Sequence, residues 1–92
     1  MIVNFAHKGL NRFYEVGDRS KLAAELVDRI AVVLAALDEA AAVTDLDRPS
    51  FRLHQLKGDL RGHWSITVRA NWRITFTFDD GDVSDVDFVD YH

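Results

Sequence analysis

Seven side chains in the second half of this chain could bind and transform a phosphate ester. They comprise two imidazoles, a carboxylate, a phenol and three cations: His54, Lys57, Arg69, Arg73, Asp90, Tyr91 and His92. Two imidazoles can act as base and acid near neutral pH, while cations stabilise the charge that builds on phosphate oxygens. Such a set suffices to cleave RNA without a metal: a base deprotonates the 2'-OH, the alkoxide attacks phosphorus, and an acid protonates the leaving 5' oxygen. DNA lacks this hydroxyl and would stay intact.

Each of these residues also has a structural explanation. A histidine on a strand, such as His54, is commonly an ordinary surface or core residue, and the final three residues could be a solvated chain end. Arg69 and Arg73 could pair with carboxylates of the acidic last strand. His54, His92 and Asp90 are also the ingredients of a two-histidine, one-carboxylate metal triad, but they lack a tight ligand motif and lie among cations. We therefore expect no metal and no cofactor.

The charge of the chain is distributed unevenly. The formal net charge is -4, but residues 48–73 hold 6 Lys/Arg and 1 Asp/Glu, whereas residues 74–92 hold 0 and 6. This basic strip, residues 48–73, is typical of a nucleic-acid site on an otherwise acidic surface. It equally fits neighbouring strands of opposite charge that pair across a sheet.

Length and composition predict one small cytoplasmic domain over residues 1–92. A chain of 92 residues has room for a single modest core, and its 48% hydrophobic content is that of an ordinary globule. There is no cysteine, so no disulfide or thiolate metal site is expected. A membrane span needs about 18 consecutive apolar residues, and no stretch of this sequence comes close to that length. The sequence therefore predicts no membrane association.

The first half of the chain predicts a short strand and two helices. Ile2 to Phe5 suggests the strand, and HKGLNRFYEVGD predicts a helix of about two to three turns that ends at Gly17. Residues 21–42 contain neither Gly nor Pro and carry an apolar stripe at helical spacing, which predicts a long amphipathic helix. Asp18 and Ser20 are suitable N-caps for it.

Four segments beyond residue 49 alternate apolar and polar residues as half-buried strands do. They are FRLHQL (51–56), HWSITVR (63–69), NWRITFTF (71–78) and DVSDVDFVDY (82–91). KGDLRG and DDGD supply the glycine and aspartate that turns demand. The predicted order β-α-α-β-β-β-β defines an α+β domain with helices packed on one face of a mainly antiparallel sheet.

Strand alternation predicts which side chains share a face. Trp64 and Trp72 share parity with Ile66 and Ile74, so we expect both indoles in the core rather than stacked on bases. Alternation breaks near the end of the last strand, and parity alone does not bring His92 to His54.

The chain as a whole resembles a known family. HKGL near the start, LHQLKGDLRGHWSITVRANWRITF in the middle and the terminal DYH resemble the HigB branch of the RelE-type toxins of bacterial type II toxin-antitoxin modules. The resemblance implies a ribosome-dependent mRNA interferase, a metal-independent endoribonuclease that cuts messenger RNA in the ribosomal A site. Carried over by position, the catalytic set is His54, Asp90, Tyr91 and His92, with Lys57, Arg69 and Arg73 binding phosphate. Gln55 stands where relatives commonly have proline.

Further expectations concern recognition and partners. Asn71 lies between Arg69 and Arg73, and its amide could read an adenine edge, although asparagine also favours turns. The resemblance implies a HigA-like helix-turn-helix antitoxin, with operator DNA contacted only through that antitoxin. The alternative is a noncatalytic toxin or binding module, either resembling the gyrase inhibitors of this superfamily or acting only as a corepressor with its antitoxin.

Overall fold

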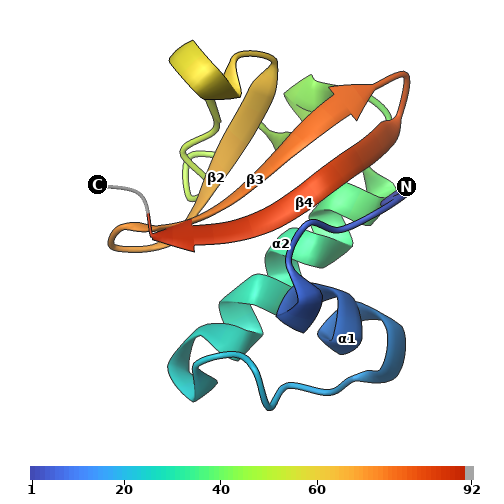
Figure 1. The fold of residues 1–92 in the computed structure, drawn as a ribbon. Coiled ribbons are helices and arrows are strands. Elements are labelled where there is room, and N and C mark those ends of the chain that lie inside the picture. The colour runs from blue at the N-terminus through green and yellow to red at the C-terminus, as the bar shows by residue number, and fades with distance from the viewer. Residues whose placement is uncertain (91–92) are drawn as a thin grey trace.

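Two helices cover one side of a four-stranded sheet in the computed structural model, which describes residues 1–90 (Figure 1). The helices are α1 (Lys8–Val16) and α2 (Val27–Glu39). The strands are β1 (His54–Gln55), β2 (His63–Arg69), β3 (Trp72–Asp79) and β4 (Asp82–Asp90). Three 3-10 helices connect them, at Ala24–Leu26, Val43–Leu46 and Gly58–Leu60. The α+β prediction is confirmed.

Helix α1 forms where the sequence predicts it. The Nδ1 atom of His7 accepts a hydrogen bond from the backbone N–H of Leu10 at 3.1 Å and so caps the first turn. Gly17 ends the helix with φ of 74°, a left-handed conformation that glycine adopts without a Cβ clash.

Helix α2 is shorter than predicted. Asp18 does not cap it, because its carboxylate instead accepts the N–H of Ser20 at 3.0 Å in a local turn. Leu22 is buried ahead of the helix, and Ala24–Leu26 makes one 3-10 turn before the α-helix begins. At the other end Ala40 is extended. The prediction of helix over residues 21–42 was therefore wrong at both ends.

The sheet is antiparallel in the order β1-β2-β3-β4, and β2 and β3 match their predicted bounds closely. The predicted opening strand forms only two isolated parallel bridges to β4, Ile2 to Val83 and Phe5 to Val86. The strand predicted over residues 51–56 is reduced to the two residues of β1. Arg52 adopts φ of 48° and so interrupts the extended backbone ahead of β1. No helix among residues 1–90 is long and apolar enough to cross a membrane.

The core lies between the helices and the sheet. Helix α2 packs against β2 and α1 packs against β4. Ile66, Ile74 and Phe76 are fully buried there, as alternation predicts.

Trp72 departs from the prediction that both indoles lie in the core. Trp64 is half-buried and packs against the core, but Trp72 is 37% exposed and stacks on Phe88, with ring centroids 4.8 Å apart. It is the first residue of β3, so it stands at the end of the sheet, past the buried row.

A β-bulge interrupts the pairing of β3 with β4. The register shifts between Thr75 and Thr77, and Asp85 on β4 has φ of 54°. Asn4 supports the bulge, because its side-chain oxygen accepts the N–H of Asp85 at 2.6 Å. Val83 and Val86 are consequently both buried although three positions separate them. The break in alternation thus falls earlier in the strand than the sequence suggested.

Candidate active site

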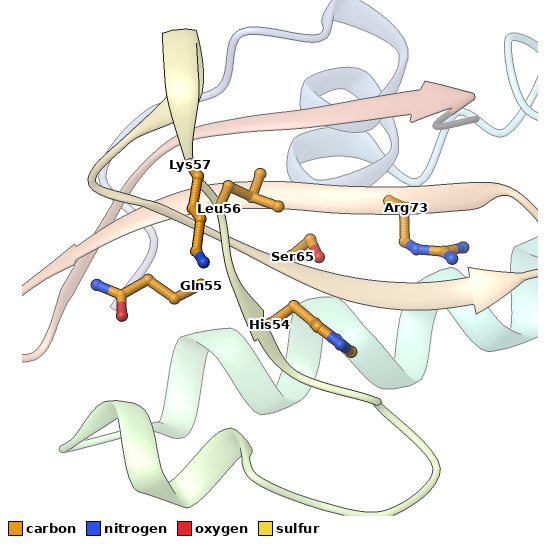
Figure 2. Close-up of a pocket in the computed structure, with 6 residues that line it drawn as sticks. All are labelled: His54, Gln55, Leu56, Lys57, Ser65 and Arg73. Atoms are coloured by element: carbon orange, nitrogen blue, oxygen red, sulfur yellow. The ribbon is translucent and has the colours of Figure 1, made fainter.

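A cavity of about 340 Å³ lies beside β1, β2 and the start of β3. Its lining residues come from three separate stretches of the chain: His54, Gln55, Leu56, Lys57, Ser65 and Arg73 (Figure 2). Among the described residues, the lining includes two cations and no carboxylate, so it favours an anion. In the view of Figure 2, Ser65 lies between Lys57 on one side and His54 and Arg73 on the other.

The loop before β1 fixes the position of His54. Phe51 is buried in the core, and the guanidinium groups of Arg29 and Arg48 lie 5.1 Å and 4.9 Å from its ring centroid. Arg29 also donates a hydrogen bond to the Ser50 carbonyl. The backbone N–H of Thr67 on β2 donates to the Phe51 carbonyl at 2.8 Å. The exposed His54 therefore follows an anchored segment.

One hydrogen bond sets the tautomer of the neutral His54 ring. Nδ1 lies 2.7 Å from the carbonyl oxygen of Arg52. Because a carbonyl can only accept, Nδ1 must carry the hydrogen, and in the neutral ring Nε2 then keeps its lone pair. His54 is therefore set up to take a proton through Nε2.

Ser65 forms the buried floor of the cavity. It pairs directly with His54 across β1 and β2, and with Thr75 across β2 and β3, and each hydroxyl residue is only 4% exposed. The row continues to Asp87 on β4. Ser65 was absent from the residues predicted for the site, since the pairing register that places it below His54 cannot be read from local alternation.

Arg73 is held by the turn that precedes it. Its Nη1 atom donates to the Ala70 carbonyl at 2.5 Å and to the Trp72 carbonyl at 3.4 Å. Within residues 1–90, its Nε and Nη2 hydrogens have no such partner, so they are available to an anion. Among the described residues, no ion pair joins Arg73 or Arg69 to Asp82, Asp85 or Asp87 of β4.

Among the described residues, Arg69, Asn71 and Asp90 of the predicted set do not line this cavity. Asn71 lies in the turn between β2 and β3, and Asp90 ends β4 in the position paired with Trp72. Arg69 lines a different cavity, together with Trp72. Tyr91 and His92 lie outside the described residues. The structure thus brings together His54, Lys57 and Arg73 from the predicted set.

This arrangement combines a proton acceptor with a site for a phosphate. Lys57 and Arg73 can bind phosphate oxygens, and the Nε2 lone pair of His54 can take a proton from a hydroxyl placed beside them. Among residues 1–90, no group of three or more His, Cys, Asp or Glu side chains could hold a metal ion.

Two helices on an antiparallel sheet, with this cationic cavity at β1, define a RelE-like toxin fold. Residues 3–92 match the family described as the RelE-like toxin of the type II toxin-antitoxin system HigB. The chain belongs to this HigB-like toxin family, which confirms the resemblance drawn from the sequence.

Relatives and solved structures agree with this assignment. The chain is 51% identical to "Endoribonuclease HigB" of Proteus vulgaris over 92 residues, 100% of both chains, and 35% identical to "Toxin HigB-1" of Vibrio cholerae over 83 residues, 88% of this chain and 87% of that one. A heterotetrameric YoeB-YefM toxin-antitoxin complex from Staphylococcus aureus contains a similar fold, with a TM-score of 0.63 at 20% identity over 100% of this chain and 95% of the other. A YafQ variant from E. coli gives a TM-score of 0.62 at 12% identity, covering 95% and 87% of the two chains.

Proposed function

We propose that this toxin is a metal-independent endoribonuclease that cuts messenger RNA in the ribosomal A site and so inhibits translation. The observation that carries the proposal is the cavity that His54, Lys57 and Arg73 line together, with Nδ1 of His54 bonded to the Arg52 carbonyl. The 51% identical relative that bears the name endoribonuclease supports the same activity.

In this mechanism His54 is the general base. Its Nε2 takes the proton of the 2'-OH, and the resulting alkoxide attacks the adjacent phosphorus. Arg73 and Lys57 stabilise the negative charge on the phosphate oxygens as the transition state forms. His92 supplies the proton that the leaving 5' oxygen requires, with Asp90 orienting an imidazole and Tyr91 contacting the same phosphate. Arg69 and Asn71 contact RNA beyond the scissile bond, and Asn71 reads a base edge.

The ribosome supplies what the small cavity lacks. The six residues that line the cavity can bind one phosphate, but they cannot orient a flexible RNA chain for in-line attack. A messenger already held in the A site presents its backbone in a fixed geometry, and the basic strip adds attraction to ribosomal phosphates. We therefore expect little cleavage of naked RNA by the free toxin.

The partner that restrains the toxin is an antitoxin. Membership in a toxin-antitoxin family supports such a partner, and the YoeB neighbour was solved as a complex with its antitoxin YefM. We propose a HigA-like helix-turn-helix protein that excludes the toxin from the cytoplasmic ribosome and carries it to operator DNA. The toxin itself contacts no DNA in this scheme.

The test is induced expression of the wild type, His54→Ala, His92→Ala and the control Arg19→Ala, with growth followed and 5' ends of cellular messages mapped. Arg19 is an exposed cation outside the basic strip that does not line the cavity. We expect wild type and Arg19→Ala to halt growth and cut only translated messages, and both histidine variants, still folded, to do neither. Growth arrest by all four proteins without new RNA ends would overturn the proposal and direct attention to inhibition of gyrase, measured by DNA supercoiling.

A further inference from the structure

A second cavity, of about 510 Å³, lies where the turn between β2 and β3 approaches the segment before α2. Small, charged and aromatic residues line it: Ala23, Glu25, Leu26, Arg69, Ala70 and Trp72. Trp72 and Arg73 are neighbours in β3, so their side chains leave opposite faces of the sheet. The two cavities therefore flank the same strand end from opposite sides, and of the residues that line the second one the mechanism above uses only Arg69.

Trp72 forms one wall of this cavity as a rigid aromatic surface. Its indole stacks on Phe88 with an angle of 19° between the rings, and Phe88 in turn meets the His7 ring edge-on at 5.8 Å. The residue is nevertheless 37% exposed and lines the cavity. A partly exposed indole that is backed by a second ring is a suitable surface for stacking the bases of single-stranded nucleic acids.

The charged groups beside Trp72 suit the other parts of a nucleotide. Arg69 and Glu25 are both exposed, and within residues 1–90 neither side chain forms a hydrogen bond or an ion pair. Arg69 can bind a phosphate through two parallel N–H donors. Glu25 as a carboxylate can only accept hydrogen bonds, so the partner it selects must donate. Leu26, 3% exposed, adds apolar surface to the lining.

We propose that this second cavity binds one unpaired guanine nucleotide of RNA. The base stacks on Trp72, the phosphate binds Arg69, and the guanine edge donates its N1 and N2 hydrogens to the two oxygens of Glu25. Adenine and cytosine present one amino group beside an acceptor on this edge, and uracil presents one N–H between two carbonyls, so each places an acceptor toward the carboxylate. The proposal deepens the proposed function, since it rests on RNA being the ligand of this toxin.

Trp72 fluorescence can test the inference without any cleavage. The chain has two tryptophans, so Trp64→Phe leaves Trp72 as the single reporter. The probes are the 5'-monophosphates of guanosine, adenosine, cytidine and uridine, which contain no bond for the toxin to cut. We expect saturable quenching by guanosine monophosphate, with the other three binding about 10-fold more weakly or worse. If Trp64→Phe fails to fold, the indole N–H resonances of ¹⁵N-labelled wild type, assigned with Trp72→Phe, give the same information.

Two variants in the Trp64→Phe background assign the contacts. Glu25→Gln should abolish the preference for guanosine monophosphate, whereas Arg69→Gln should weaken all four nucleotides alike and reduce the dependence of binding on salt. Absence of saturable quenching, or equal affinity for all four bases in the parent protein, would overturn the inference. The inference would also be overturned if the antitoxin protected this cavity and no nucleotide bound there. The cavity would then be a protein interface.

The source of the guanine is distinguished with Glu25→Gln in the wild-type background. A changed base preference next to the mapped cut sites identifies the messenger, whereas weaker cosedimentation with ribosomes that carry no messenger identifies ribosomal RNA. Either result supports the inference. Absence of cleavage by the wild-type toxin, when the purified protein still prefers guanosine monophosphate, would count against the proposed ribonuclease and not against this site.

Discussion

His54 and Ser65 occupy directly paired positions on β1 and β2, and this cross-strand pair brings an exposed imidazole and a buried serine to the lining of one cavity. The strand β1 has only two residues, so its alignment depends on few contacts. One of them is the hydrogen bond from the Leu56 N–H to the His63 carbonyl at 2.9 Å. The geometry of the candidate active site is therefore sensitive to the volume of the residue at position 65.

Enlarging Ser65 should reduce cleavage strongly while the loss of stability is too small to unfold the protein. Ser65→Leu forces extra methylene groups into a position that is 4% exposed, which should lower the free energy of unfolding by about 1–3 kcal/mol and displace His54. We expect cleavage in a reconstituted translation reaction to fall at least 10-fold while urea denaturation still shows a folded protein. Ser65→Ala keeps the shape and should lose much less. If Ser65→Leu cuts as well as Ser65→Ala, the cavity floor has no part in positioning His54.

The hydrogen bond between His54 and the Arg52 carbonyl allows a test of whether His54 acts as a general base or only positions the loop. In His54→Asn the amide nitrogen can take the place of Nδ1 and keep this bond, but nothing replaces the lone pair of Nε2. If His54 is the general base, we expect about a 10²–10⁴-fold loss of cleavage in His54→Asn, matching His54→Ala. Near wild-type cleavage in His54→Asn would show that the ring acts only through its contact with the loop.

The guanidinium geometry of Arg73 should matter beyond its charge. Arg73 donates to the Ala70 and Trp72 carbonyls through Nη1. Among residues 1–90, its Nε and Nη2 atoms have no such acceptor and can donate to a phosphate. A lysine ammonium cannot donate to the carbonyls of the turn and bind a phosphate at the same time with the geometry of a guanidinium. We expect Arg73→Lys to reduce single-turnover cleavage on the ribosome about 10-fold to 10³-fold, with Arg61→Lys unchanged. Full activity in Arg73→Lys would reduce the role of Arg73 to bulk charge.

Asn71 provides a test of base reading apart from catalysis. It lies in the turn between β2 and β3, outside the cavity that holds His54. If its amide reads a base, Asn71→Ala should change which codons are cut and leave total cutting near wild type, as measured by mapping 5' ends. An equal loss at every codon would mean that Asn71 serves the turn instead.

The fold was more predictable than the site, for a physical reason. Apolar periodicity located α1, β2 and β3 because burial of one face imposes it on the sequence. It missed the start of α2, where Asp18 stabilises a turn, and the two-residue length of β1, where Arg52 turns the chain. The pairing of Ser65 with His54, the separation of Arg69 from Arg73 and the exposure of Trp72 all depend on register and bulges. Local patterns do not encode these features.

A cluster far from the site gives a pH-dependent test of stability. The hydroxyl of Tyr14 donates to Asp38 at 2.6 Å, and the N–H of Ile2 donates to the other carboxylate oxygen at 2.9 Å. Burial acts to raise the pKa of Asp38, but these hydrogen bonds and the N-terminal ammonium outweigh it and hold that pKa below its ordinary value. The bond to Asp38 correspondingly raises the pKa of Tyr14.

The sign of the effect follows from linkage. A carboxyl group whose pKa is lower in the folded state stabilises the fold above its unfolded pKa of about 3.9, and this contribution is lost as pH falls through the folded value. Tyr14→Phe removes the hydroxyl donor from Asp38 and should lower the free energy of unfolding at pH 7 by about 0.5–1 kcal/mol, a modest figure because Tyr14 is partly exposed. Urea denaturation of both proteins at pH 7 and at a series of decreasing acid pH values should show the difference shrinking as Asp38 becomes protonated. A difference that is the same at all of these pH values would mean that Tyr14 contributes through its packing on Phe5, at 5.3 Å between ring centroids, and not through the carboxylate.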